Sequence, residues 1–154
     1  MLPNNSPFPA FTLKNQDGKT LSLKDFSKQW LVLYVYPKDD TPGCTVQGKA
    51  FTATRAEFDK AGIRVVGVSA DDVESHKNFC NKFSLTIDLL ADPGAELLKA
   101  AQVGQSDYKG TLYWDRTTFV IDPRGVLRKT YLKVSPEGHE QILLNDIHAL
   151  KAQH

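Results

Sequence analysis

The sequence contains little cysteine and no long hydrophobic run. Its 154 residues include two cysteines, Cys44 and Cys80, which are too few for a small disulfide-stabilised scaffold. They do not form a Cys-x-x-Cys pair, which argues against a thioredoxin-type dithiol and against a cysteine zinc site. The longest apolar run, Trp30–Tyr36, is far shorter than the roughly 20 residues that cross a bilayer. We therefore expect no membrane partner.

Charge of one sign is not in excess either. The 19 lysines and arginines nearly balance the 18 aspartates and glutamates, for a net charge of +1. Without a cluster of basic residues, no nucleic-acid partner is expected. The start of the chain, Met1–Asn5, has neither a cationic end nor an apolar stretch. We therefore expect no secretory signal and a cytoplasmic location.

The histidines do not follow the spacing of a metal site, so we expect them at the surface and expect no bound metal. They are His76, His139, His148 and His154. Two acidic pairs, Asp39-Asp40 and Asp71-Asp72, could resemble metal carboxylates, but loop and helix-capping roles explain them better.

Size and composition predict one globular domain over residues 1–154, with an extended, proline-containing lead-in at residues 1–9. Alternating residues on either side of Asn15–Gly18 predict an N-terminal β-hairpin. Two continuous apolar runs, Trp30–Tyr36 and Ile63–Ser69, predict strands that are buried on both faces.

A helical pattern from Pro42 to Ala61 lies between these two strands, so the three elements form a parallel crossover unit. Three more helices are predicted, at Asp72–Phe83, from an Asp92 N-cap through Ala101, and from Ser135-Pro136 onward. The remaining strands are a short one and a hairpin, at Ile87–Leu90, Thr117–Ile121 and Val126–Tyr131. Together they predict an α/β fold whose mixed sheet has helices on both faces.

The most informative segment, Tyr36-Pro-Lys-Asp-Asp-Thr-Pro-Gly-Cys-Thr45, lies where a buried strand passes into a helix. Thr41 suits the N-cap and Pro42 the first helical position, which places Cys44 in the first turn. The unpaired N–H groups and the helix dipole there favour a thiolate over a thiol. The Thr41 hydroxyl could donate to the sulfur or to a substrate oxygen, and Pro37 and Pro42 could screen the sulfur from water. Alternatively, Cys44 is a small residue packed under a loop.

The spacing Pro37-x-x-x-Thr41-x-x-Cys44 resembles the active-site motif of the peroxiredoxins. The fuller segment resembles their peroxiredoxin Q branch, also called bacterioferritin comigratory proteins. The order of elements resembles the peroxiredoxin form of the thioredoxin fold, from about Phe8 to Leu150. The resemblance implies a peroxidase without metal or other cofactor, acting on hydrogen peroxide and organic hydroperoxides. It implies that the Cys44 thiolate attacks the terminal peroxide oxygen and becomes a sulfenic acid.

The same resemblance implies that an arginine from a distant strand completes the site, and the matching residue is Arg116. A guanidinium would stabilise the thiolate and the charge that develops on the leaving oxygen. The N–H groups of Gly43 and Cys44 are further candidate donors to the peroxide. The alternative for Arg116 is an ordinary ion pair with the neighbouring Asp115.

Many members of the branch carry a second, resolving cysteine five residues after the first, but Lys49 occupies that position here. A second subset places it in the next helix, which implies that Cys80 resolves the sulfenic acid as an intramolecular disulfide. Thioredoxin or a similar dithiol would then reduce this disulfide. Alternatively, Cys80 shares an apolar face with Val73 and Phe83 and is an inert core residue.

Two helices separated by a strand are not expected to hold Cys44 and Cys80 within the ~4.4–6.8 Å Cα spacing that a disulfide requires. Our hypothesis is that one or both helical segments unwind, which Gly48 makes easier by roughly 1 kcal/mol relative to alanine. Two alternatives remain open: a one-cysteine peroxidase recycled by an external thiol, and a redox-sensing or chaperone-like binding module without turnover. We expect a monomer.

Overall fold

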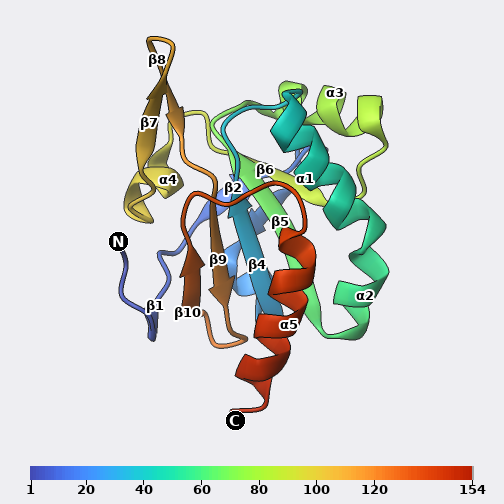
Figure 1. Cartoon of the computed structure of the whole chain (residues 1–154), viewed down its shortest axis with the longest axis vertical. Helices are drawn as coiled ribbons and strands as arrows, with labels where there is room; N and C mark the ends of the chain where they lie inside the picture. The colour runs from blue at the N-terminus through green and yellow to red at the C-terminus, as the bar shows by residue number, and fades with distance from the viewer. Residues whose placement is uncertain (154) are drawn as a thin grey trace.

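The computed structural model describes residues 1–153, and an eight-stranded mixed sheet forms its centre (Figure 1). In sheet order the strands are β1 (Ser6–Pro7), β10 (Val126–Tyr131), β9 (Thr117–Ile121), β4 (Trp30–Val35), β5 (Ile63–Ser69), β6 (Asp88–Ala91), β2 (Thr12–Lys14) and β3 (Thr20–Ser22). Strand β1 pairs with β10 and joins the expected lead-in to the edge of the sheet. A separate hairpin consists of β7 (Gln105–Tyr108) and β8 (Thr111–Trp114).

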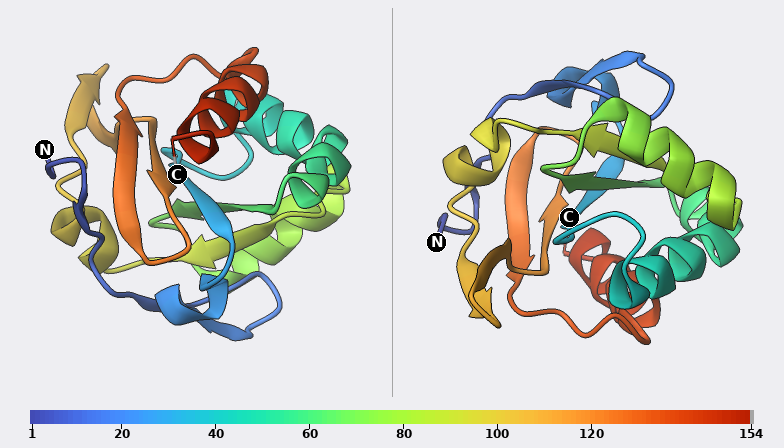
Figure 2. Two further views of the ribbon diagram at one scale, coloured as in Figure 1. Left: turned by 90° about the horizontal axis from the view of Figure 1, so that it is seen from below. Right: turned by 90° about the horizontal axis from the view of Figure 1, so that it is seen from above.

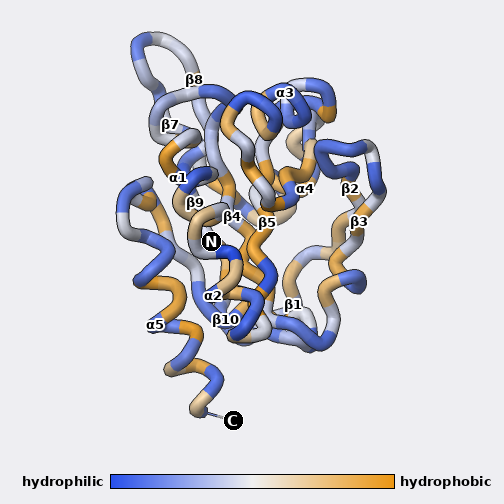
Figure 3. Tube along the Cα trace, turned by 90° about the vertical axis from the view of Figure 1, so that its right-hand side faces the viewer, coloured by the Kyte–Doolittle hydropathy of each residue, from blue (hydrophilic) through white to orange (hydrophobic). Residues whose placement is uncertain are grey.

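Strand β4 is the centre of the sheet and is buried along its whole length. It runs parallel to β5 and antiparallel to β9, as the crossover and hairpin patterns predict. Its side chains alternate between two cores: Trp30, Val32 and Tyr34 face one, and Leu31, Leu33 and Val35 the other. The central strands are accordingly the most hydrophobic part of the trace (Figure 3). The prediction of a strand buried on both faces is confirmed.

The two cores are covered by different elements (Figure 2). One lies beneath α1 (Pro42–Ala53), α2 (Arg55–Lys60), α3 (Val73–Phe83) and α5 (His139–Lys151). The other lies beneath the β2–β3 hairpin, the 3-10 turn η1 (Leu23–Phe26) and α4 (Glu96–Ala100). The predicted α/β class, with a mixed sheet, a β-hairpin and helices on both faces, is confirmed. None of the helices within residues 1–153 is long and apolar enough to cross a membrane.

The helix expected over residues 42–61 is interrupted at Thr54, where α1 ends and α2 begins. The Thr54 backbone has φ −100° and ψ 4°, outside the helical range. Its hydroxyl donates to the Ala50 carbonyl at 2.8 Å, and its N–H bonds to the same carbonyl at 3.1 Å. A threonine that bonds to the backbone one turn earlier commonly bends a helix. The hydrophobic spacing continues through the bend, so the sequence pattern did not reveal it.

Two other helices begin later than predicted, both after a left-handed residue. Helix α4 follows Ala95 (φ 54°), although the Asp92 carboxylate accepts from the N–H groups of Glu96 and Leu98 as a capping residue would. Helix α5 follows Gly138 (φ 76°), so the predicted start at 135–136 is wrong. The hairpin of β7 and β8 was not predicted because its sequence is polar and largely exposed.

The prediction of surface histidines is wrong for two of them. His76 has no exposed area, and His139 is 5% exposed, while His148 is exposed. His154 lies outside the described residues. His139 Nε2 lies 3.0 Å from the Thr118 hydroxyl, and burial lowers the pKa of His139 to about 4.

This burial predicts a pH dependence of stability. Below the ordinary histidine pKa of 6.5, the unfolded chain gains a proton at residue 139 that the folded chain does not. The free energy of unfolding should therefore fall as the pH drops from about 6.5 to about 4. In urea titrations, the wild type should lose more stability than His139→Gln over this range, by on the order of 1 kcal/mol. Equal losses in the two proteins would contradict a neutral, buried His139.

Candidate active site

The sheet register brings two distant segments to one edge. Strand β4 ends at Val35, and a loop leads from Tyr36 to the start of α1 at Pro42. Val35 lies opposite Thr117 on β9. The residue before Thr117, Arg116, therefore emerges beside the loop and the first turn of α1. Its carbonyl accepts from the N–H of Val134 at 3.0 Å, which fixes the backbone there.

Helix α1 begins as predicted, with Thr41 as N-cap (φ −110°, ψ 155°) and Pro42 in the first turn. The Thr41 hydroxyl donates to the Lys38 carbonyl at 2.8 Å and does not cap the helix. Since no side chain caps this turn, the N–H groups of Gly43 and Cys44 remain suited to an oxygen ligand. Pro37 is half-buried beside this turn, and Pro42 is exposed.

The guanidinium of Arg116 lies against Gly43, the residue before Cys44. A Cβ on residue 43 would lie 3.0 Å from Cζ of Arg116 and closer still to Nη2. Arg116 Nη1 donates to Gln47 Oε1 at 2.7 Å. The alternative pairing with Asp115 is not observed among the ion pairs of residues 1–153, and the Asp115 carboxylate accepts from Ser106 instead. The helix N-terminus and a fixed positive charge thus meet beside Cys44.

Gln47 is a candidate site residue that the sequence analysis missed. It lies three positions after Cys44, on the same side of α1, and is 1% exposed. Oε1 of Gln47 accepts the hydrogen bond from Arg116. The buried Nε2 of Gln47 has no partner within the described part of the chain. An unsatisfied buried donor costs about 1–3 kcal/mol, so a bound oxygen atom would stabilise it. The spacing of three from Cys44 was the available signal.

The two cysteines are free thiols, and both are buried in the same hydrophobic core. Cys44 is 1% exposed and Cys80 7%. Burial, followed by the charges of Asp39, Asp17 and Asp88, raises the pKa of Cys80 to about 12. In this fold Cys80 is therefore a thiol near neutral pH and a poor nucleophile.

Tyr34 lies close to both cysteines, under α1 and α3. Burial is the main cause that raises the pKa of Tyr34, and charge on Cys44 or Cys80 would raise it further. Its ring packs on Phe51 of α1, with centroids 4.7 Å apart. Tyr34, Phe51 and both cysteines thus belong to one buried cluster under α1 and α3.

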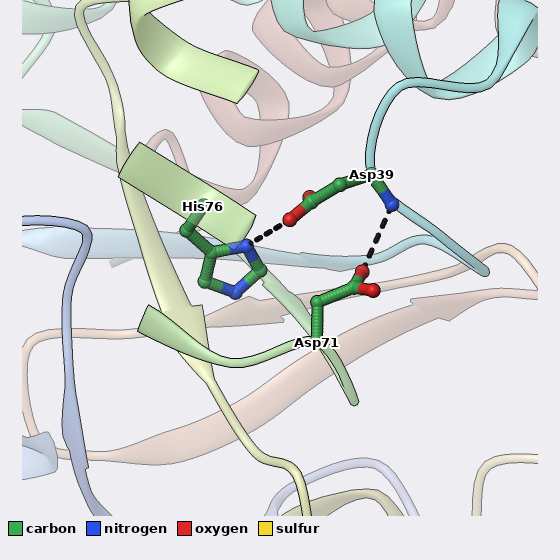
Figure 4. A group of neighbouring side chains, drawn as sticks. All are labelled: Asp39, Asp71 and His76. Atoms are coloured by element: carbon green, nitrogen blue, oxygen red, sulfur yellow. Dashed lines mark hydrogen bonds and ion pairs between the residues drawn. The ribbon is translucent and has the colours of Figure 1, made fainter. Parts of the chain in front are cut away.

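One group of residues has the spacing of metal ligands within residues 1–153: Asp39, Asp71 and His76 (Figure 4). Its oxygen atoms are already engaged. Asp39 Oδ2 lies 2.7 Å from His76 Nδ1, and Asp71 Oδ2 accepts from the Asp39 N–H at 2.9 Å and from Ser69 at 2.7 Å. A metal would have to displace these bonds. The cluster is better explained as an internal hydrogen-bond network.

The chain is similar to known peroxidases over most of its length. The model of the AhpC/TSA family matches residues 5–130. A putative peroxiredoxin bcp of Helicobacter pylori is 43% identical over 145 residues, which cover 90% of this chain and 93% of that protein. A chloroplastic peroxiredoxin Q of Populus jackii is 48% identical over 132 residues, or 85% of this chain. The matched region is 61% of that longer relative.

A solved structure of peroxiredoxin Q from Xanthomonas campestris superimposes with a TM-score of 0.85, at 37% identity over 90% of each chain. Structures also exist of two serine variants of that protein, at cysteines that are 36 positions apart. Cys44 and Cys80 have the same separation, so both cysteines of this chain match that pattern.

The close approach of Arg116 to Gly43 generates a prediction. A Cβ in Gly43→Ala would collide with the flexible end of Arg116 and push the guanidinium away from Cys44. Loss of such a preorganised donor should lower kcat/KM for hydrogen peroxide by about 10–100-fold. The thermal midpoint should change little, because the severe overlap is with the flexible end of Arg116, while the Pro136 ring, 3.3 Å from the added Cβ, has to give by only a few tenths of an ångström.

Gly94→Ala is the matched control, since its Cβ would meet nothing closer than 3.7 Å. It should retain full activity. Wild-type kcat/KM in Gly43→Ala would show that the position of the guanidinium does not matter.

Proposed function

Because the chain belongs to the AhpC/TSA family, as a peroxiredoxin of the Q branch and hence a thiol peroxidase, we propose that Cys44 is its peroxidatic residue. Thr41 and Arg116 would act with it on hydrogen peroxide and small organic hydroperoxides. The observation that carries this proposal is the guanidinium of Arg116 against the first turn of α1, beside a cysteine whose helix N-terminus has no side-chain cap.

In the first step, the Cys44 thiolate attacks the terminal oxygen of the hydroperoxide. The S–O bond forms as the O–O bond breaks, and the leaving alkoxide or hydroxide takes up a proton. Negative charge moves from sulfur to the leaving oxygen, so donors that face both atoms lower the barrier. Arg116 and the N–H groups of Gly43 and Cys44 are suited to this role, and Gln47 Nε2 supplies a further donor.

In the second step, the sulfur of Cys80 attacks the sulfenic sulfur of Cys44. The S–S bond forms, and the hydroxyl group leaves with a proton as water. Both thiols are buried, and the pKa of Cys80 is about 12 in the folded helix. Exposure to water would remove the main cause of this shift and increase the thiolate fraction. Local unwinding of α3 would therefore both allow Cys80 to approach Cys44 and make the Cys80 thiol more reactive.

The disulfide then needs an external reductant, for which we propose thioredoxin or a similar dithiol. We further propose that the chain acts as a monomer, because an intrachain resolving thiol removes the need for a second subunit. The proposed location is the cytoplasm.

A one-cysteine peroxidase is the second candidate function. It is favoured by the raised pKa of Cys80 and by its burial beside Phe79, which an inert core thiol would also show. In that case Cys80→Ser would turn over normally with an external thiol. In the two-cysteine cycle the same variant would lose turnover with thioredoxin.

One equivalent of hydrogen peroxide distinguishes the two cycles. The two-cysteine proposal predicts that the reduced protein loses two hydrogens and yields a Cys44–Cys80 cross-linked peptide in mass spectrometry. A stable gain of one oxygen on Cys44 would instead support the one-cysteine cycle. Cys44→Ser should consume no peroxide, and residual consumption would contradict the assignment of Cys44.

A further inference from the structure

A buried polar cluster joins the loop before Cys44 to the helix that carries Cys80 (Figure 4). Asp39 lies in that loop, two residues before the N-cap Thr41. His76 lies on α3, one helical turn before Cys80. Asp39 is 7% exposed and His76 is fully buried. Groups this polar are buried only when they are paired, so their partners define the role of the cluster.

Asp39 bonds to the helix through both His76 and its neighbour. Its Oδ2 lies 2.7 Å from His76 Nδ1 and accepts from the Ser75 hydroxyl at 2.8 Å. Its Oδ1 accepts from the Tyr36 hydroxyl at 2.6 Å, and its N–H donates to Asp71 at 2.9 Å. Tyr36, just after β4, thus holds the carboxylate, and Asp71, just after β5, holds the backbone of Asp39. The carboxylate in turn binds α3.

The contact between Asp39 and His76 is a short hydrogen bond inside a buried network. His76 Nε2 lies 2.8 Å from the Leu90 carbonyl, which only accepts, so Nε2 carries a proton. The Tyr36 hydroxyl donates a hydrogen bond to Asp39 Oδ1. On its other side the ring is held through Nδ1, which lies 2.7 Å from Asp39 Oδ2 and 3.3 Å from the Tyr36 hydroxyl. Removing one partner of such a buried hydrogen bond leaves the other polar group unsatisfied, which destabilises the contact between the loop and α3.

A second link connects the same loop and helix at the surface. Lys82 Nζ lies 2.8 Å from Asp40 Oδ2, with the side chains 60% and 48% exposed. Exposed pairs of this kind contribute little, because water screens them. The two links differ mainly in burial, so the second serves as an internal control for the first.

Building on the proposed resolving role of Cys80, we propose that the Asp39–His76 pair is a latch that holds α3 folded while Cys44 reacts. The latch must break before Cys80 can reach the sulfenic acid. Asp39 and His76 are positioning residues, since they act through the helix and touch neither sulfur in the proposed cycle. The latch therefore sets how long the sulfenic acid survives.

That lifetime decides between two fates of the sulfenic acid. In one, Cys80 forms the S–S bond and water leaves. In the other, the sulfenic sulfur attacks a second hydroperoxide, whose O–O bond breaks as one oxygen passes to the sulfur. An alcohol or water leaves, and the product on Cys44 is a sulfinic acid. Because the latch delays only the first fate, it raises the fraction of sulfinic acid at a given peroxide concentration.

The test uses the full-length reduced protein in single-turnover mixing with hydrogen peroxide, followed by acid quench and mass spectrometry. It measures the rates of Cys44 oxidation and of disulfide formation, and the sulfinic fraction in excess peroxide. Asp39→Asn and His76→Gln should each speed disulfide formation about tenfold and lower the sulfinic fraction accordingly. The rate of Cys44 oxidation should stay within about twofold of wild type.

Asp40→Asn is the matched control, in the same loop and facing the same helix, and should leave the rates and the fraction unchanged. Leu143→Ala in α5 provides a second control, because it destabilises the same core without touching the latch. It should not alter the ratio of the two rates. Should Asp39→Asn fail to fold, His76→Gln alone still tests the proposal.

The outcomes separate the latch from the function on which it depends. If the wild type forms the disulfide and both latch variants form it no faster, the latch is refuted and the resolving role of Cys80 stands. An acceleration in Asp39→Asn alone would also refute it, since the loss of charge near Cys80 would then be the cause. If the wild type forms no Cys44–Cys80 disulfide, the proposed function fails and the latch fails with it.

Discussion

The contact between Arg116 and the first turn of α1 is the interaction on which the site depends. It requires three separate features: a residue without Cβ at position 43, the pairing of Val35 with Thr117, and Gln47 as acceptor for the guanidinium. A shift of one residue in the β4–β9 register would turn Arg116 to the other face of the sheet. The pairing of the buried strands therefore places Arg116 at the edge of the sheet, where Gln47 holds its guanidinium.

The cores also explain why the proposed two-cysteine cycle needs more than one conformation. Burial in one core keeps both cysteines from water, and it makes Cys80 a poor nucleophile because it raises the pKa of the thiol. A fold that served only the first step could remain closed throughout. A fold in which both cysteines take part must have a segment that opens at modest free-energy cost. Helix α3 is the segment proposed to open, and its first half is held by polar contacts with the loop before α1 and with the Leu90 carbonyl.

Local sequence patterns predicted the strands and the Cys44 turn, because burial on both faces and helix capping depend on residues that are neighbours in the sequence. Tertiary effects were harder to predict. The bend at Thr54 keeps its hydrophobic spacing, and Gly138 displaces the start of α5. The burial of His76 depends on Asp39, distant in the sequence. Motif resemblance pointed to Arg116, which lies beside the first turn of α1, but not to Gln47, whose contact depends on where the guanidinium lies. The residues missed were those whose partners come from another element.

The packing of Gly48 against Leu85 has a mechanical consequence. A Cβ on residue 48 would lie 2.9 Å from the Leu85 side chain, and the N–H of Leu85 donates to the Cys80 carbonyl at 3.0 Å. Movement of Cys80 out of its helix would therefore pull Leu85 away from Gly48, which lies on α1 one turn after Cys44. Leu85 therefore couples the two cysteine-bearing segments mechanically, so that movement of α3 is transmitted to the middle of α1.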